Sequence, residues 1–132
     1  MSRPVNVLVV EDDVTIWRAL EPWLRRRGYQ PYWASNVGQA LDFLQTDPIH
    51  LVLLDVGIGG GFSGLAILPR LDPKKTRCII VSGHESDRIR EEIANFSLSR
   101  VSLIVGKPLD FERLEHIIED VIDPNWKVQT KG

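Results

Sequence analysis

The stretch VLVVEDD at residues 7–13 joins four consecutive apolar residues to three acidic ones. A short run of this kind, rich in β-branched side chains, is typical of a strand that is buried on both faces. Further short segments rich in apolar residues predict five strands in all, at residues 5–10, 29–34, 50–56, 77–82 and 101–105. The acidic residues therefore lie just past the end of the first predicted strand.

Amphipathic stretches separate the apolar runs. In these stretches apolar residues recur every three or four positions, which is the spacing of one face of an α-helix. They predict helices at residues 14–27, 37–45, 64–71, 86–96 and 111–122. Strands that alternate with helices and are apolar on both faces predict an α/β fold with a doubly wound parallel sheet.

The composition is that of an ordinary globular chain. Its 132 residues suffice for one domain, which we place at residues 1–123, followed by a polar C-terminal tail at 124–132. The 16 basic and 18 acidic side chains give a net charge of -2, so we expect no direct nucleic-acid partner. A single cysteine, Cys78, and the lack of a secretion signal or a long apolar run favour a cytoplasmic protein without membrane insertion.

Residues that can take part in chemistry lie at or just past the ends of four of the five predicted strands. Glu11 and Asp12 follow the first, Asp55 lies near the end of the third, Ser82 ends the fourth and Lys107 follows the fifth. The carboxyl ends of parallel strands meet at one edge of a sheet, which is where ligands bind. Two carboxylates roughly 5 Å apart repel by about 3 kcal/mol at an effective dielectric constant near 20, which favours a bound cation such as Mg²⁺. A carboxylate, a metal ion, an ammonium and a hydroxyl are together the parts of a phosphoryl-transfer site.

Over residues 5–122 the chain resembles the receiver domain of bacterial two-component response regulators. The resemblance is carried by VLVVEDD at 7–13, LVLLD at 51–55, IIVSG at 79–83 and VGKP at 105–108, in the order of that family. It implies a flavodoxin-like, CheY-like sheet with the strand order 2-1-3-4-5.

The resemblance also implies a role for each site residue. Asp55 would be the phosphoacceptor, and Mg²⁺ would be held by Glu11, Asp12, Asp55 and the backbone carbonyl of Gly57. The phosphoryl oxygens would be bound by Ser82 and Lys107, and a cis peptide would join Lys107 to Pro108.

A member of this family is a signalling domain rather than an enzyme with a separate substrate. It would take a phosphoryl group from a sensor histidine kinase or a histidine phosphotransfer protein, lose it again by autodephosphorylation, and change the surface that a downstream effector protein binds. Because little sequence follows Ile122, we expect a stand-alone receiver. A piece of a larger regulator or hybrid kinase is the alternative.

Two positions depart from the family pattern. Gly59 stands where the family usually has a proline four residues after the acceptor, and Ile104 stands where many members have an aromatic residue that moves on activation. The second departure leaves open how the signal would be transmitted.

Three other functions are consistent with part of the pattern. Gly59, Gly61 and Gly64 match the GxGxxG dinucleotide motif, but they follow the third predicted strand rather than the first. A phosphatase of the haloacid dehalogenase class also uses an aspartate nucleophile, but it needs a second acid where Gly57 stands. A pseudo-receiver that only binds partners is disfavoured by the intact site residues, notably Asp55.

Overall fold

The computed structural model describes residues 4–60, 63–83, 90–92 and 101–122. In this part of the chain five parallel strands form one sheet in the order β2-β1-β3-β4-β5, which confirms the predicted fold class. The strands are β1 (Asn6–Val10), β2 (Gln30–Ala34), β3 (Leu51–Asp55), β4 (Arg77–Ser82) and β5 (Leu103–Gly106). The chain leaves β1 for the edge strand β2 and returns to β3 on the other side of β1. The winding direction therefore reverses between β1 and β3.

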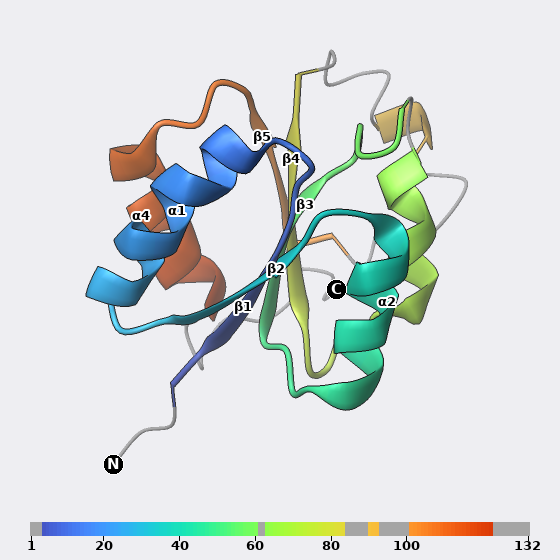
Figure 1. The fold of residues 1–132 in the computed structure, drawn as a ribbon, viewed down its shortest axis with the longest axis horizontal. Helices are drawn as coiled ribbons and strands as arrows, with labels where there is room; N and C mark the ends of the chain where they lie inside the picture. The colour runs from blue at the N-terminus through green and yellow to red at the C-terminus, as the bar shows by residue number, and fades with distance from the viewer. Residues whose placement is uncertain (1–3, 61–62, 84–89, 93–100, 123–132) are drawn as a thin grey trace, which may run out of the picture.

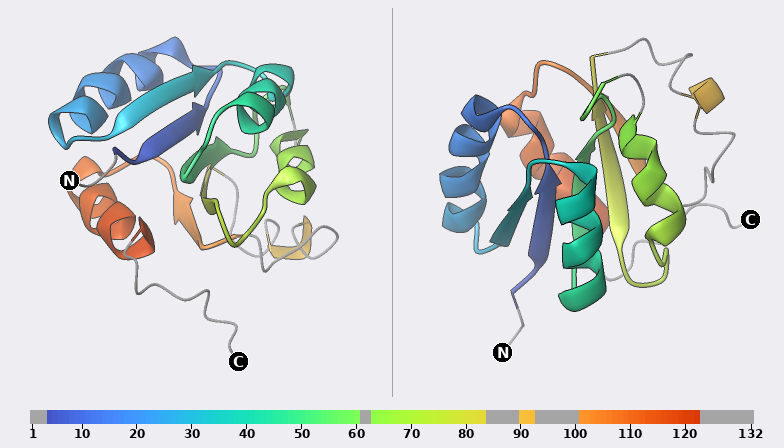
Figure 2. Two further views of the ribbon diagram at one scale, coloured as in Figure 1. Left: turned by 90° about the horizontal axis from the view of Figure 1, so that it is seen from below. Right: turned by 45° about the vertical axis from the view of Figure 1, so that its right-hand side comes forward.

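Helices cover both faces of the sheet (Figures 1 and 2). On one face lie α1 (Val14–Arg26) and α4 (Phe111–Ile122), and on the other lie α2 (Val37–Thr46) and the 3-10 helix η1 (Ser63–Arg70). No helix in the described part of the chain combines the length and the apolar character needed to cross a membrane.

The two faces of the sheet build two separate hydrophobic cores. Along β1, Val7 and Val9 pack with α1 and α4, whereas Leu8 and Val10 pack with α2 and η1. All four side chains are at most 1% exposed. Successive residues of a strand point to opposite faces, so a strand buried on both faces has to be apolar at every position.

Helix starts are fixed by side chains that accept backbone hydrogen bonds. The carboxylate of Asp13 accepts from the Thr15 N–H at 2.8 Å, and the Asn36 side chain accepts from the Gln39 N–H at 2.8 Å. Each bond satisfies a donor that has no partner within its own helix. The Asp13 cap fixes where α1 begins, directly after the acidic segment of VLVVEDD.

The strand and helix boundaries agree with the sequence predictions to within two residues, apart from two elements. The helix predicted at 64–71 is a 3-10 helix rather than an α-helix, and it contains Pro69, which has no N–H to donate. The helix predicted at 86–96 lies outside the described residues except for 90–92, which are helical. The predicted tail at 124–132 also lies outside them.

Candidate functional site

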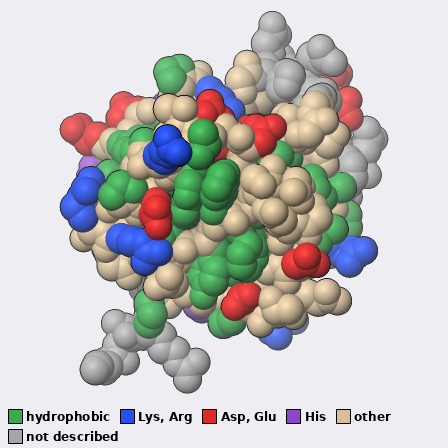
Figure 3. Space-filling model, in the orientation of Figure 1, with side chains coloured by type: hydrophobic (Ala, Val, Ile, Leu, Met, Phe, Trp, Pro, Cys, Tyr) green, Lys and Arg blue, Asp and Glu red, His purple; other side chains and the backbone are tan. Residues whose placement is uncertain are grey.

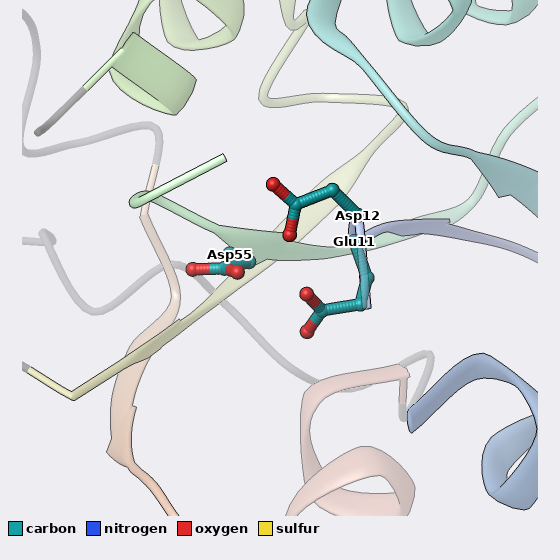
Figure 4. Close-up of side chains that lie close together, drawn as sticks. All are labelled: Glu11, Asp12 and Asp55. Carbon is teal, nitrogen blue, oxygen red and sulfur yellow. The ribbon is translucent and has the colours of Figure 1, made fainter. Parts of the chain in front are cut away.

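An acidic cluster lies at the switch point between β1 and β3. The strands pair Val10 with Leu54, which places the residues that follow them side by side. Each of Glu11, Asp12 and Asp55 offers a carboxylate oxygen, and these three oxygens lie within 4.8 Å of one another. The three side chains point into the same space (Figure 4). Glu11 and Asp55 are buried, whereas Asp12 is exposed, so the cluster opens to solvent on the Asp12 side.

Lys107 closes the cluster from the other side of β3. Strands β4 and β5 pair Ser82 with Gly106, and the Lys107 N–H donates to the Ser82 carbonyl at 2.9 Å. The Lys107 Nζ then lies 3.2 Å from Asp55 Oδ2 and 3.7 Å from Glu11 Oε1. The peptide between Lys107 and Pro108 is cis. One ammonium thus contacts two carboxylates that come from different strands.

The second oxygen of Asp55 is held by the loop that follows β3. Asp55 Oδ1 accepts a hydrogen bond from the Gly57 N–H at 2.9 Å. The Gly57 carbonyl accepts a hydrogen bond from the Gly60 N–H at 2.8 Å, and one of its lone pairs is thereby used. Each carboxylate oxygen of Asp55 therefore has a polar partner, Gly57 N–H for Oδ1 and the Lys107 ammonium for Oδ2, and the two contacts orient the side chain.

Gly64 packs directly against the backbone of the acceptor strand. A Cβ at this position would lie 2.7 Å from the Asp55 carbonyl oxygen and 2.9 Å from the Val56 Cα. The Gly64 N–H also donates to the Val56 carbonyl at 2.9 Å. Only glycine allows η1 to approach this closely, so Gly64 helps to fix the end of β3.

Burial and charge shift two pKa values in the site. Burial is the largest cause that raises the pKa of Glu11 to about 7, and the neighbouring Asp55 carboxylate adds to it. The Asp13 N–H, which donates to Glu11 Oε2 at 3.1 Å, and the Lys107 ammonium oppose this rise. Partial burial alone would lower the pKa of Lys107, but the carboxylates of Asp55 and Glu11 outweigh it, and the net shift is upward. Lys107 is therefore a stable cation at neutral pH.

The raised pKa of Glu11 predicts a pH-dependent stability of the metal-free protein. Its ordinary value is 4.5 and its value in the folded protein is about 7, so the folded state binds the proton more tightly than the unfolded state. The stabilising contribution is complete below pH 4.5 and is lost as the pH rises through 7. We expect the free energy of unfolding in a chelator to fall by up to about 3 kcal/mol between pH 4.5 and 8, relative to a Glu11→Gln control. Urea titrations that give parallel pH profiles for the two proteins would contradict this.

The donor set of the cluster fits a hard divalent cation. Mg²⁺ prefers oxygen ligands, is usually held by one or two carboxylates, and keeps several waters. The cluster supplies three converging carboxylates, of which Asp12 is reachable from solvent. The cluster therefore has both the ligand type and the open side that such an ion needs.

The structure brings Glu11, Asp12, Asp55 and Lys107 together, as the strand ends suggested. Ser82 is buried at the end of β4, and its carbonyl accepts the hydrogen bond from the Lys107 N–H. The sequence pattern did not indicate Trp33, whose indole N–H donates to the Glu11 carbonyl at 2.7 Å.

Comparisons with known proteins give one consistent family. A family model described as the response regulator receiver domain matches residues 7–119. The chain is 31% identical over 117 residues to sporulation initiation phosphotransferase F of Bacillus subtilis (strain 168), which covers 86% of this chain and 90% of that protein. It is also 34% identical over 83 residues to a putative NtrX-like response regulator of Rickettsia felis. That match covers 61% of this chain and only 18% of the longer relative.

Solved structures share the fold. A CheY-like response regulator receiver domain protein from Methanospirillum hungatei JF-1 matches with a TM-score of 0.81 and 22% identity, over 98% of this chain and all of that one. A response regulator protein from Burkholderia pseudomallei, whose structure contains a phosphorylated aspartic acid, a calcium ion and citrate, matches with a TM-score of 0.73 and 24% identity. This second match covers 89% of this chain and 66% of that one.

The family match spans most of the chain, and the sheet order and the strand-end cluster agree with it. The chain therefore belongs to the response regulator receiver domain family, whose members are signalling domains of two-component systems.

Proposed function

We propose that this receiver domain accepts a phosphoryl group on Asp55 from the phosphohistidine of a sensor histidine kinase or a histidine phosphotransfer protein. The observation that carries the proposal is the position of Asp55, a buried carboxylate that contacts one ammonium and has an oxygen within 4.8 Å of those of two further carboxylates. The phosphotransferase from Bacillus subtilis and the phosphorylated aspartic acid in the Burkholderia pseudomallei protein support it.

The transfer step is an in-line displacement at phosphorus. A carboxylate oxygen of Asp55 attacks the phosphorus atom, a P–O bond forms, and the P–N bond to the donor imidazole breaks. The imidazole leaves with the electron pair of that bond and takes up a proton. Water later attacks the phosphorus of the acyl phosphate, which releases phosphate and restores the Asp55 carboxylate. This domain thereby catalyses its own dephosphorylation.

Each of the other site residues has a task in this step. Glu11, Asp12, Asp55 and the Gly57 carbonyl would hold Mg²⁺, which when bound supplies positive charge to the transferring phosphoryl oxygens. Lys107 would exchange its ion pair with Asp55 Oδ2 for one with a phosphoryl oxygen. Ser82, at the end of β4, would donate its hydroxyl to another phosphoryl oxygen.

Phosphorylation would reach a downstream effector through β5. Lys107 follows this strand directly, so a change in its ion pair acts on the strand end. Leu103 of the same strand is 38% exposed, and the neighbouring Ile104 packs partly against the core beside η1. We infer that the effector binds the surface around β5. The aromatic side chain that many members of the family have at position 104 takes no part, because Ile104 stands there.

The test is incubation of the protein with acetyl phosphate, followed by measurement of the intact mass. With Mg²⁺ present we expect the mass to increase by one phosphoryl group, and with a chelator in its place we expect no increase. An unchanged mass under both conditions would contradict the proposal. Steady turnover of p-nitrophenyl phosphate would favour a phosphatase of the haloacid dehalogenase class instead.

A further inference from the structure

We propose that Trp33 is a positioning residue for the acidic pair, because its indole N–H holds the peptide that joins Glu11 to Asp12. This inference rests on the proposed function, since it concerns how the two carboxylates are presented to a divalent cation. Trp33 lies in the edge strand β2, and its Nε1 lies 2.7 Å from the Glu11 carbonyl oxygen.

The bond extends the pairing of β1 and β2 beyond their last paired residues. The two strands pair Val10 with Ala34, and the next N–H, that of Glu11, donates to the Ala34 carbonyl at 3.0 Å. The Trp33 indole N–H donates to the carbonyl of Glu11. Both polar backbone groups of Glu11 are therefore bonded to β2, one through its backbone and one through a side chain.

The orientation of this peptide influences where the two carboxylates point. The Glu11 carbonyl lies in one rigid plane with the Cα atoms of Glu11 and Asp12. Holding the oxygen therefore restricts the rotation of this plane, on which the relative directions of a buried carboxylate and an exposed one depend. These like charges repel at the separation found in the cluster, and a rotation of the plane would let them move apart.

Trp17 holds the Trp33 ring from the side of α1. The two indole rings stack with their centroids 5.5 Å apart and their planes 10° apart. Helix α1 begins at Val14, two residues after Asp12. The ring pair therefore links the helix that follows the acidic segment to the strand β2, which lies beside β1. In the view of Figure 1, β2 passes between α1 and α2, and Figure 3 shows hydrophobic side chains in the same part of this face.

The test compares two variants that make the same change in the same ring pair. Trp33→Phe keeps an aromatic ring but removes the donor to Glu11, whereas Trp17→Phe changes the other ring of the stack. We measure Mn²⁺ affinity from the signal of the free ion in electron paramagnetic resonance, and thermal stability in a chelator. We expect Trp33→Phe to bind Mn²⁺ about tenfold more weakly, as is common when a group that orients a metal ligand is lost. Trp17→Phe keeps an aromatic ring beside Trp33 and leaves the Trp33 donor in place, so it should weaken Mn²⁺ binding far less.

The outcomes separate this inference from the proposed function. If the parent protein binds Mn²⁺ and Trp33→Phe binds it equally well, only the positioning role is wrong. Equal weakening in both variants, in step with lost thermal stability, would also overturn it by showing a packing effect. If the parent binds no Mn²⁺, the proposed metal site fails as well.

A second measurement uses the unaltered protein and so does not depend on how a variant folds. In NMR spectra with labelled indoles, the Trp33 N–H should exchange slowly with solvent and shift when Mg²⁺ is added, and the Trp17 N–H should shift much less. A Trp33 N–H that exchanges rapidly with solvent and does not shift when Mg²⁺ is added would contradict the inference.

Discussion

Asp55→Asn protein should gain no phosphoryl group from acetyl phosphate and Mg²⁺ under conditions in which the parent is modified. The amide keeps the shape of the side chain but has no anionic oxygen to attack phosphorus. It also removes the negative charge that Lys107 contacts at 3.2 Å and one of the three carboxylates of the cluster. We therefore expect complete loss of the adduct in intact mass spectra.

Asp42→Asn is the matched control for this change. Asp42 is an exposed carboxylate in α2, away from the acidic cluster, and its replacement should leave the adduct unchanged. An adduct of equal size on Asp55→Asn and on the parent would show that another residue accepts the phosphoryl group.

Lys107→Met should slow phosphorylation by acetyl phosphate by about 100-fold or more. Methionine fills a similar volume but carries no charge, and loss of one preorganised donor to a developing charge typically costs a factor of about 100 to 1,000. The Lys107 ammonium contacts both Asp55 and Glu11, and it lowers the pKa of Glu11. Loss of the ammonium therefore also destabilises the ionised form of Glu11, which is a predicted metal ligand.

The rate is measured from the growth of the phosphorylated mass with time at saturating Mg²⁺. Lys74→Met, at an exposed lysine in the turn before β4, is the control and should react at the parent rate. A Lys107→Met protein that is folded by circular dichroism and reacts as fast as this control would remove Lys107 from the transfer step.

Much of the fold was predictable because the sheet is buried on both faces. Strands such as β3, in which every residue is buried, appear in the sequence as apolar runs that are broken only at the strand end. The site was predictable for a related reason, since carboxyl ends of parallel strands lie at one edge of the sheet. Polar residues directly after the runs, such as Asp55 and Lys107, therefore meet in space.

Other features depend on contacts that the sequence pattern does not contain. The spacing of apolar residues in a short segment is similar for an α-helix and a 3-10 helix, so η1 was predicted only as a helix. Three consecutive acids do not reveal which one is buried, and only the packing shows that Glu11 is buried and Asp12 exposed. The bond from Trp33 to Glu11 depends on β2 lying beside β1.

The central claim is that β1, β3 and β5 end at one site, which binds a divalent cation and a phosphoryl group together. A crystal structure of the protein grown with Mg²⁺ and beryllium fluoride, a mimic of the phosphoryl group, tests it most directly. We expect Mg²⁺ at about 2.1 Å from oxygens of Asp12 and Asp55, with beryllium on Asp55 and a fluorine against the Lys107 ammonium. Electron density that places the ion or the fluoride elsewhere, with Asp55 unmodified, would contradict it.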